Sequence, residues 1–121
     1  DTLLGERGVS LSGGQKQRLA MSRALIINPE ILILDDSLSA VDAKTEHVIL
    51  ENLKQERADK TTIITAHRLS AIVHADLILV MENGRIKERG NHQELLAAQG
   101  WYAQTYQNQQ LYERFKEESA K

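Results

Sequence analysis

Apolar and polar positions in this chain follow two periods, one typical of helices and one typical of strands. The first part of the pattern predicts a helix over residues 12–27. Ser12 is its expected N-cap, and Asn28-Pro29 ends it because proline disfavours helical backbone in the preceding residue. Residues 31–34, Ile-Leu-Ile-Leu, form a continuous apolar run, which is typical of a strand covered on both faces in a parallel sheet. The helix residues expected to face inward are Ala20, Ala24 and Ile27.

The middle of the chain repeats this order of helix and strand. A second helix is predicted over residues 43–57, with Asp42 as its candidate cap, and residues 61–65 form the next strand. A short helix over residues 69–73 precedes a third strand over residues 77–81. Strands and helices in this alternation predict a parallel sheet with right-handed crossovers. In such sheets ligands bind at the carboxyl ends of the strands.

The last part of the chain predicts a hairpin and two helices. Asn83-Gly84 is typical of a tight hairpin turn into a further strand. Asn91, followed by Glu94 three residues later, resembles a capping box for a short helix that ends near Leu96. A final helix is expected over residues 101–116, and the last few residues are expected to fray.

Composition narrows the class of protein. The chain has 121 residues, of which 41% are hydrophobic, enough for one small domain or for part of a larger one. Its 15 basic and 17 acidic residues argue against a broad basic surface for nucleic acid. The absence of cysteine excludes disulfides and thiolate metal sites. No run of 18 apolar residues exists, so we expect no direct membrane insertion by this segment.

Two neighbouring acids follow the first predicted strand. Carboxylates at the end of a buried strand are costly unless they are solvated, hydrogen-bonded or neutralised by a cation. Of Asp35 and Asp36, one could therefore hold Mg²⁺ through water, and the other could orient or deprotonate an attacking water. Taken by themselves, the two acids are as well explained by one capping the following turn while the other is solvated.

Two further features carry the same ambiguity. In Ser12-Gly13-Gly14-Gln15, glycines at a helix start let the backbone approach a ligand, and free N–H groups attract anions. The plainer alternative is an ordinary N-cap with a flexible entry. His67, after the second strand, could donate to a phosphate or position a water, or it could be a structural histidine.

Taken together, these strings resemble the second half of an ABC-type ATPase domain. LSGGQ at residues 11–15 is followed by ILILDD at 31–36, SAVD at 39–42 and TAHR at 65–68, in the order and spacing of that family. The resemblance covers essentially the whole chain, and LSGGQ is its most specific part. It implies a partial P-loop NTPase fold of class α/β, with parallel core strands, flanking helices, and a C-terminal hairpin and helices.

The resemblance also implies roles for the candidate residues. Asp35 corresponds to the Walker B aspartate that binds Mg²⁺ through water, Asp36 to the catalytic acid, and His67 to the switch histidine at the γ-phosphate. Residues 39–42 correspond to the D-loop, which crosses the interface of two ATPase domains and places Asp42 near the nucleotides. The signature motif, which meets ATP held by the opposite domain, corresponds to Ser12, Gly13, Gly14 and Gln15.

The partners implied by the resemblance are a second ABC ATPase domain and a transmembrane domain. The loop Gly5–Gly8 resembles the one that touches the coupling helices of the membrane domain in ABC exporters. With the strings AHRLS at residues 66–70 and GNHQEL at 90–95, it points to the exporter branch. The implied function is a motor that couples ATP hydrolysis to export, at the cytoplasmic face of the cell membrane.

Two departures from the family pattern qualify this interpretation. No glycine is followed by lysine, so the Walker A motif is missing, as is the Q-loop. We therefore expect residues 1–121 to be the C-terminal part of an ATPase domain, inactive by itself. Asp36 stands where the family usually has glutamate, which predicts a slow site in one half of a heterodimer. The alternative is a homodimer in which aspartate works adequately.

Two rival functions remain at this stage. One is a soluble ABC ATPase of DNA repair or translation, which shares the signature and Walker B strings. The loop Gly5–Gly8 and the SAVD and AHRLS strings argue against it. The other is a non-enzymatic interaction module, which the missing Walker A motif would favour in a complete protein.

Overall fold

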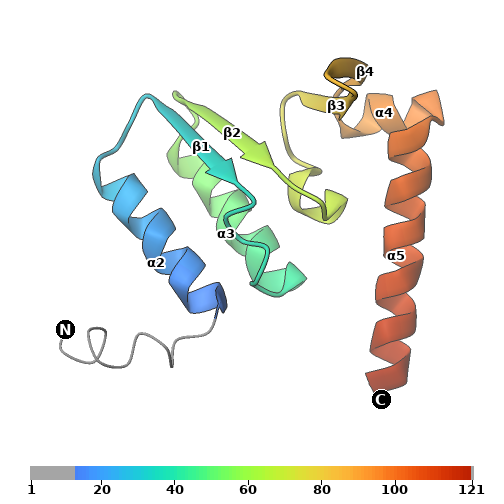
Figure 1. Ribbon diagram of the computed structural model, residues 1–121, viewed down its shortest axis with the longest axis horizontal. Helices are drawn as coiled ribbons and strands as arrows, with labels where there is room; N and C mark the ends of the chain where they lie inside the picture. Colours follow the sequence, from blue (N-terminus) through green and yellow to red (C-terminus); the bar gives the residue numbers. More distant parts are fainter. Residues whose placement is uncertain (1–12, 121) are drawn as a thin grey trace. The chain divides into compact units, whose positions relative to one another are not determined.

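The computed structural model describes residues 13–120, drawn in colour in Figure 1. The chain divides into two compact units, Asp1–His67 and Arg68–Lys121. Each unit contains helices and strands, so the expected α/β class is confirmed. Ser12, the predicted cap, and the loop Gly5–Gly8 lie outside the described residues.

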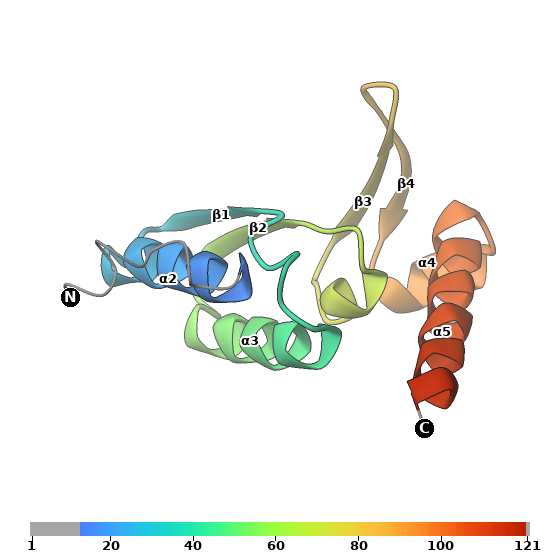
Figure 2. The same ribbon diagram turned by 60° about the horizontal axis from the view of Figure 1, so that its bottom comes forward.

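The first unit pairs two parallel strands. Strands β1 (Ile31–Asp35) and β2 (Thr61–Thr65) run in register, from Ile31 beside Thr61 to Asp35 beside Thr65. Figures 1 and 2 show helices α2 (Gly13–Ile26) and α3 (Ala43–Glu56) on the same side of these strands. The order of elements and the parallel pairing are those that the sequence predicts.

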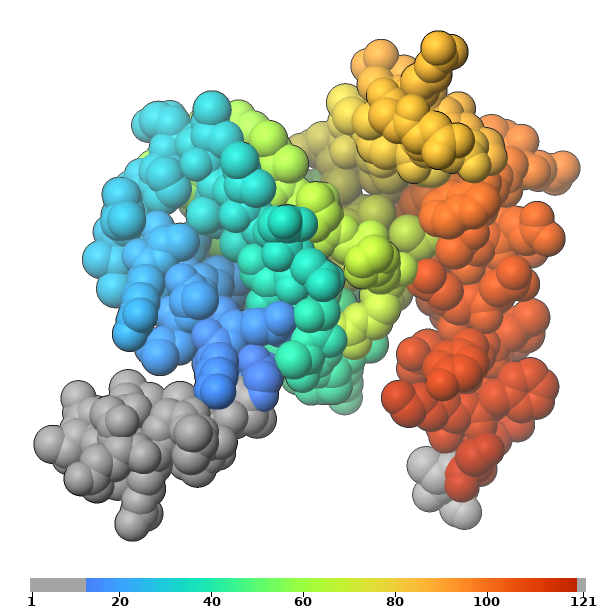
Figure 3. Space-filling model, in the orientation of Figure 1, coloured from blue at the N-terminus to red at the C-terminus, as the bar shows by residue number. Residues whose placement is uncertain are grey.

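Among the residues that the structure describes, strand β1 is covered on one face only, which corrects the prediction of a strand buried on both. Leu32 and Leu34 are each 4% exposed, whereas Ile31 and Ile33 on the opposite face are 60% and 63% exposed. Ile63 of β2 is exposed in the same way. The reason is that α2 and α3 both pack on the face that carries Leu32 and Leu34. Figure 3 shows the opposite face, with atoms of β1 and β2 at its surface.

The predicted inward face of α2 is wrong by about one residue. Met21 and Gly14 are buried, and they lie seven residues apart on one side of the helix. Ala20 and Ile27 are exposed, and Ala24 is half-buried. Helix α2 has no broad apolar stripe. The predicted inward face relied largely on the small side chains of Ala20 and Ala24, which indicate the orientation of a helix only weakly.

Helix α3 agrees more closely with the sequence. Leu50 and Leu53 are buried as expected from their spacing. Asp42 is the N-cap, and its Oδ2 accepts a hydrogen bond of 3.1 Å from the N–H of Thr45. This bond satisfies one of the free N–H groups that every helix has at its start.

The second unit corrects the prediction of a third parallel strand. Strand β3 (Ile78–Glu82) pairs antiparallel with β4 (Arg85–Gly90) in a separate two-stranded sheet. The Asn83-Gly84 turn explains this, because both residues have positive φ, 51° and 76°, as the tightest hairpin turns require. A strand that enters such a hairpin is committed to antiparallel pairing with the strand that follows.

Three helical segments complete the second unit. The short helix η2 (Leu69–Ile72) precedes the hairpin, and α4 (His92–Ala98) and α5 (Trp101–Ala120) follow it. The capping box of Asn91 and Glu94 is present with both of its hydrogen bonds, as predicted. Helix α5 continues to Ala120, beyond its predicted end near Lys116. None of the described helices is long and apolar enough to cross a membrane.

Tyr102 is the centre of the core of the second unit. It is completely buried, in a cluster with Leu69, Ile78 and Leu95. Its hydroxyl lies 2.8 Å from Nδ1 of His92. Burial, with a smaller contribution from Tyr106, raises the pKa of Tyr102 to about 12, so the hydroxyl keeps its proton at neutral pH.

His92 is suited to accept that proton in a hydrogen bond. Burial, together with the charge of His74, lowers the pKa of His92, so the neutral ring is favoured. The rings of His92 and Tyr102 also meet edge to face, with centroids 5.7 Å apart. This polar pair therefore sits within the apolar core without an unpaired charge.

Replacing Tyr102 tests this description of the core. Tyr102→Ala should lower the free energy of unfolding of the second unit by about 3–5 kcal/mol, because it leaves a large cavity. Tyr102→Phe should cost only about 1 kcal/mol, the value of the lost hydrogen bond. Urea unfolding followed by fluorescence of Trp101, the single tryptophan and the neighbour of Tyr102, measures both. Equal losses for the two variants would contradict the role of burial.

Candidate functional site

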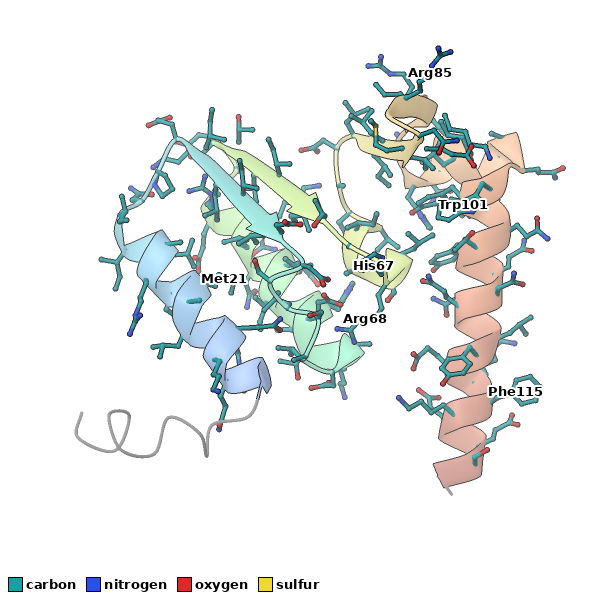
Figure 4. The ribbon with its side chains drawn as sticks, viewed as in Figure 1. Met21, His67, Arg68, Arg85, Trp101 and Phe115 are labelled. Carbon is teal, nitrogen blue, oxygen red and sulfur yellow. The ribbon has the colours of Figure 1, made fainter. Side chains whose placement is uncertain are left out.

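The carboxyl ends of β1 and β2 bring the predicted acids and His67 to one edge of the sheet. Asp35 and Thr65 are register partners at the ends of the two strands. Asp36 follows Asp35 directly, and His67 follows Thr65 after one alanine. All three predicted side chains, of Asp35, Asp36 and His67, are exposed. Figure 4 shows His67 just beyond the end of β2.

Thr65 organises this edge, a role that the sequence alone did not reveal. Its hydroxyl donates a 2.6 Å hydrogen bond to Oδ1 of Asp35. Oγ1 of Thr65 also accepts a 3.0 Å hydrogen bond from the backbone N–H of Asp36. One side chain of β2 thus binds the carboxylate of Asp35 and the backbone of Asp36. Only knowledge of the strand register could have singled out this threonine.

Asp36 adopts an unusual backbone conformation at the point where β1 ends. Its φ is 53°, in the left-handed region that most residues with a side chain avoid. Aspartate and asparagine enter this region more readily because their short polar side chains bond locally. The chain turns away from the sheet here, so Asp36 stands at its edge and not within the strand.

The start of α2 lies against the turn that follows Asp36. A Cβ atom added at Gly13 would come within 3.0 Å of Cβ of Ala40. One added at Gly14 would come within 3.1 Å of the carbonyl oxygen of Ala40 and 3.3 Å of Val41 Cγ2. The two glycines therefore permit a close approach of backbone to backbone, a packing role in addition to the anion contact expected of them.

Gln17 joins the helix to the same turn, and sequence reasoning missed it as well. Its Oε1 accepts a 2.8 Å hydrogen bond from the N–H of Ala40. Its Nε2 donates to Oγ of Ser39 at 2.9 Å and to the carbonyl oxygen of Asp36 at 3.3 Å. The residue lies one helical turn after Gly13 and Gly14, on the side of α2 that meets the turn.

The remaining predicted residues divide into two groups. Gln15 is exposed in the first turn of α2, and Asp42 ends the turn and caps α3. The first two residues of the LSGGQ string, Leu11 and Ser12, lie outside the described residues. The structure therefore places the start of α2, the turn 36–42 and the carboxyl edge of the sheet side by side.

The chemistry of these groups fits a magnesium nucleotide. Mg²⁺ prefers oxygen ligands, and the edge presents the exposed carboxylates of Asp35 and Asp36. The first turn of a 14-residue helix presents free N–H groups and the positive end of its dipole, which favour a phosphate. The chain offers no thiolate ligand, because it has no cysteine.

Acids at a strand end beside a glycine-containing helix start in an α/β unit are typical of proteins that bind phosphate groups. Comparison with known proteins narrows the class. Residues 1–39 match the family model described as ABC transporter. The probable multidrug resistance ABC transporter ATP-binding/permease protein YheI of Bacillus subtilis is 65% identical over 93% of this chain. The multidrug resistance-like ATP-binding protein MdlA of Escherichia coli is 60% identical over 92%.

A solved structure supports the same assignment. The structure of a bacterial Atm1-family ABC exporter with ATP bound matches 85% of this chain, with a TM-score of 0.78 and 47% identity. The matched region is 18% of that chain, and this sequence spans 19% of the length of each of the two relatives. The chain therefore belongs to the ATPase part of the ABC transporter family.

The hydrogen bonds of Thr65 give a test of the site geometry. Thr65→Val keeps the shape of the side chain but removes both bonds, whereas Thr65→Ser keeps the hydroxyl. In Thr65→Val the Asp36 N–H loses its acceptor, a hydrogen bond that contributes about 1 kcal/mol. The amide hydrogen of Asp36 should therefore exchange with water roughly fivefold faster. Nuclear magnetic resonance of the chain measures this rate. An unchanged rate in Thr65→Val, or an equal rise in Thr65→Ser, would contradict the assignment.

Proposed function

We propose that this chain is part of the ATP-hydrolysing motor of an ABC exporter, which couples ATP hydrolysis to the transport of a substrate across a membrane. The observation that carries the proposal is the placement of Asp35 and Asp36, fixed by Thr65, beside the start of α2. The names of the relatives, multidrug resistance transporters, favour an exporter over a soluble ABC ATPase or an interaction module.

In the proposed motor, each group at the site has a separate task. Asp35 would hold Mg²⁺ through water, and Mg²⁺ would neutralise charge on the phosphates. Asp36 would orient or deprotonate the attacking water, and His67 would contact the γ-phosphate. Gly13, Gly14 and Gln15, together with Ser12, would meet the ATP of the opposite domain. Asp42, at the end of the turn 39–42, would lie near the interface between the two nucleotides.

The proposed partners follow from the family resemblance. The string LSGGQ at residues 11–15 matches the signature motif of ABC ATPases. The signature helix would act on ATP bound by a second ABC ATPase domain. The loop Gly5–Gly8 would receive the coupling helices of a transmembrane domain, which places the motor at the cytoplasmic face of the cell membrane.

The proposed function is tested on the full-length transporter in lipid vesicles. It should hydrolyse ATP only when Mg²⁺ is present, because the two carboxylates need a hard cation to tolerate the phosphate charge. Removing the metal with a chelator should reduce phosphate release to background, and adding Mg²⁺ back should restore it. A transporter that releases no phosphate under any of these conditions would contradict the proposal.

The aspartate at position 36 allows a finer proposal, a slow ATP site. Aspartate is one methylene shorter than glutamate, and a misplacement on the order of 1 Å costs about 100-fold in rate. The turn is held by Thr65 and Gln17, which restricts how far Asp36 can move to compensate. The subunit would then contribute one slow site to a heterodimer, while its signature helix completes the partner's site.

Two substitutions distinguish a slow site from a working one. If the site is slow, Asp36→Glu should raise the ATP turnover of the full-length transporter by up to about twofold, because a second working site is added to that of the partner. Asp36→Asn, which has the same length but no charge, should then change turnover less than about twofold, because little hydrolysis passes through this site. Steady-state phosphate release measures both variants.

The homodimer alternative predicts the opposite pair of results. There Asp36→Asn abolishes hydrolysis, and Asp36→Glu brings no gain. Purification of the transporter subunit without a co-expressed partner gives an independent check, because a fully active homodimer would contradict the heterodimer.

A further inference from the structure

We propose that Gln17 is a positioning residue of this site, whose amide group sets the distance between the start of α2 and the turn after β1. The inference rests on the proposed ATPase function and adds a residue that lies outside the LSGGQ, Walker B and D-loop strings. Gln17 makes no hydrogen bond to the carboxylate of Asp35 or Asp36. Its hydrogen bonds go to the turn that carries Asp36.

The three hydrogen bonds of Gln17 involve both the oxygen and the nitrogen of its amide. Oε1 takes the N–H of Ala40 at 2.8 Å, while Nε2 donates to Ser39 Oγ at 2.9 Å and to Asp36 O at 3.3 Å. A carboxamide presents a donor and an acceptor together at the tip of one side chain. The partners lie 19 to 23 residues away in sequence, so these bonds join two separate elements.

The backbone bonds described within the turn join its own residues and do not reach α2. Within it, the N–H of Val41 donates to Leu38 O at 3.1 Å, and the N–H of Ser39 reaches Asp36 O only at 3.5 Å. Asp36 is also in the left-handed region, a conformation that persists only where its surroundings hold it. Gln17 binds the start of the turn, at the carbonyl oxygen of Asp36, and its later part, at the N–H of Ala40.

The two glycines at the start of α2 allow the helix to lie close to the turn after β1. Gly13 and Gly14 let the backbone of α2 approach Ala40 and Val41 to distances at which an added Cβ would be crowded. Gln17 is half-buried just behind this contact. The start of α2 therefore packs against the turn at Gly13 and Gly14, and Gln17 adds hydrogen bonds to the same turn. A shift of the helix would move the turn, and a shift of the turn would move the helix.

This arrangement predicts an effect on turnover more than on nucleotide affinity. If the bonds of Gln17 are lost, the turn can shift relative to α2, and a shift of about 1 Å is enough to lower a rate by roughly 100-fold. Affinity for ATP should change less, because Gln17 is not among the residues proposed to contact ATP. Replacing a residue with a purely structural role would lower the stability of the protein. It would not lower kcat selectively while leaving KM for ATP nearly unchanged.

The experiment compares three variants of the full-length transporter. Gln17→Met keeps the length but removes every hydrogen bond, and should lower kcat about 10- to 100-fold with KM for ATP within about threefold. Gln17→Glu should have an intermediate effect. The N–H of Ala40 keeps its acceptor and the hydroxyl of Ser39 can turn to donate, so only the bond to Asp36 is lost. Lys16→Met, at the exposed neighbouring position of the same helix, is the matched control and should stay within about twofold.

Two further measurements show whether Gln17 acts through the turn. Hydrogen exchange over residues 36–41, followed by mass spectrometry, should be faster in Gln17→Met than in Lys16→Met. The effects of Gln17→Met and Ser39→Ala on kcat should not add, because both remove the same bond. If Gln17→Met does not accumulate as folded protein, Gln17→Glu and Ser39→Ala carry the test with the same readouts.

The possible results separate this inference from the function on which it rests. Unchanged exchange over residues 36–41, or faster exchange with unchanged kcat, would overturn the role of Gln17 and leave the ATPase standing. Equal losses in Gln17→Met and Lys16→Met would overturn it as well. An unsubstituted transporter that hydrolyses no ATP would instead remove the proposed function, and the positioning role with it.

Discussion

The in-register parallel pairing of β1 and β2 is the constraint on which the site depends. Because Asp35 and Thr65 end their strands side by side, a single hydroxyl can bind the carboxylate of one acid and the backbone of the next. A slip of one residue would turn Thr65 to the other face of the sheet and remove both bonds. The positions of Asp36 and His67 follow from this pairing, since each leaves the sheet at the same edge.

The second constraint is the closeness of α2 to the turn after β1. Two glycines remove the side chains that would separate the backbones, and Gln17 adds three hydrogen bonds across the contact. The glycines of the LSGGQ string thus have a structural reason to be glycine that is independent of any ligand. The two reasons are compatible, because a backbone stripped of side chains can meet a neighbouring turn on one side and a phosphate on another.

Much of the local structure could be predicted from the sequence, because it depends on local chemistry. The Asn83-Gly84 turn, the capping box at Asn91 and the cap at Asp42 are each decided by residues a few positions apart. The family resemblance likewise rested on contiguous strings. The roles of Thr65 and Gln17 could not be predicted in this way, because their partners lie between 19 and 30 residues away. Only the strand register and the helix packing bring those residues together.

The predictions that were wrong share a cause as well. The third strand was assigned to the parallel sheet from its apolar run, but the turn that follows it decides its pairing.

The apolar run of β1 predicted two covered faces, and the structure covers one. That error is informative, because Ile31, Ile33 and Ile63 are the residue types that a strand uses to pack on both sides. A continuous apolar strand with one bare face is expected when the sheet continues into, or is covered by, polypeptide beyond these residues. The chain spans 19% of the length of its relatives, which have ample sequence for such a cover.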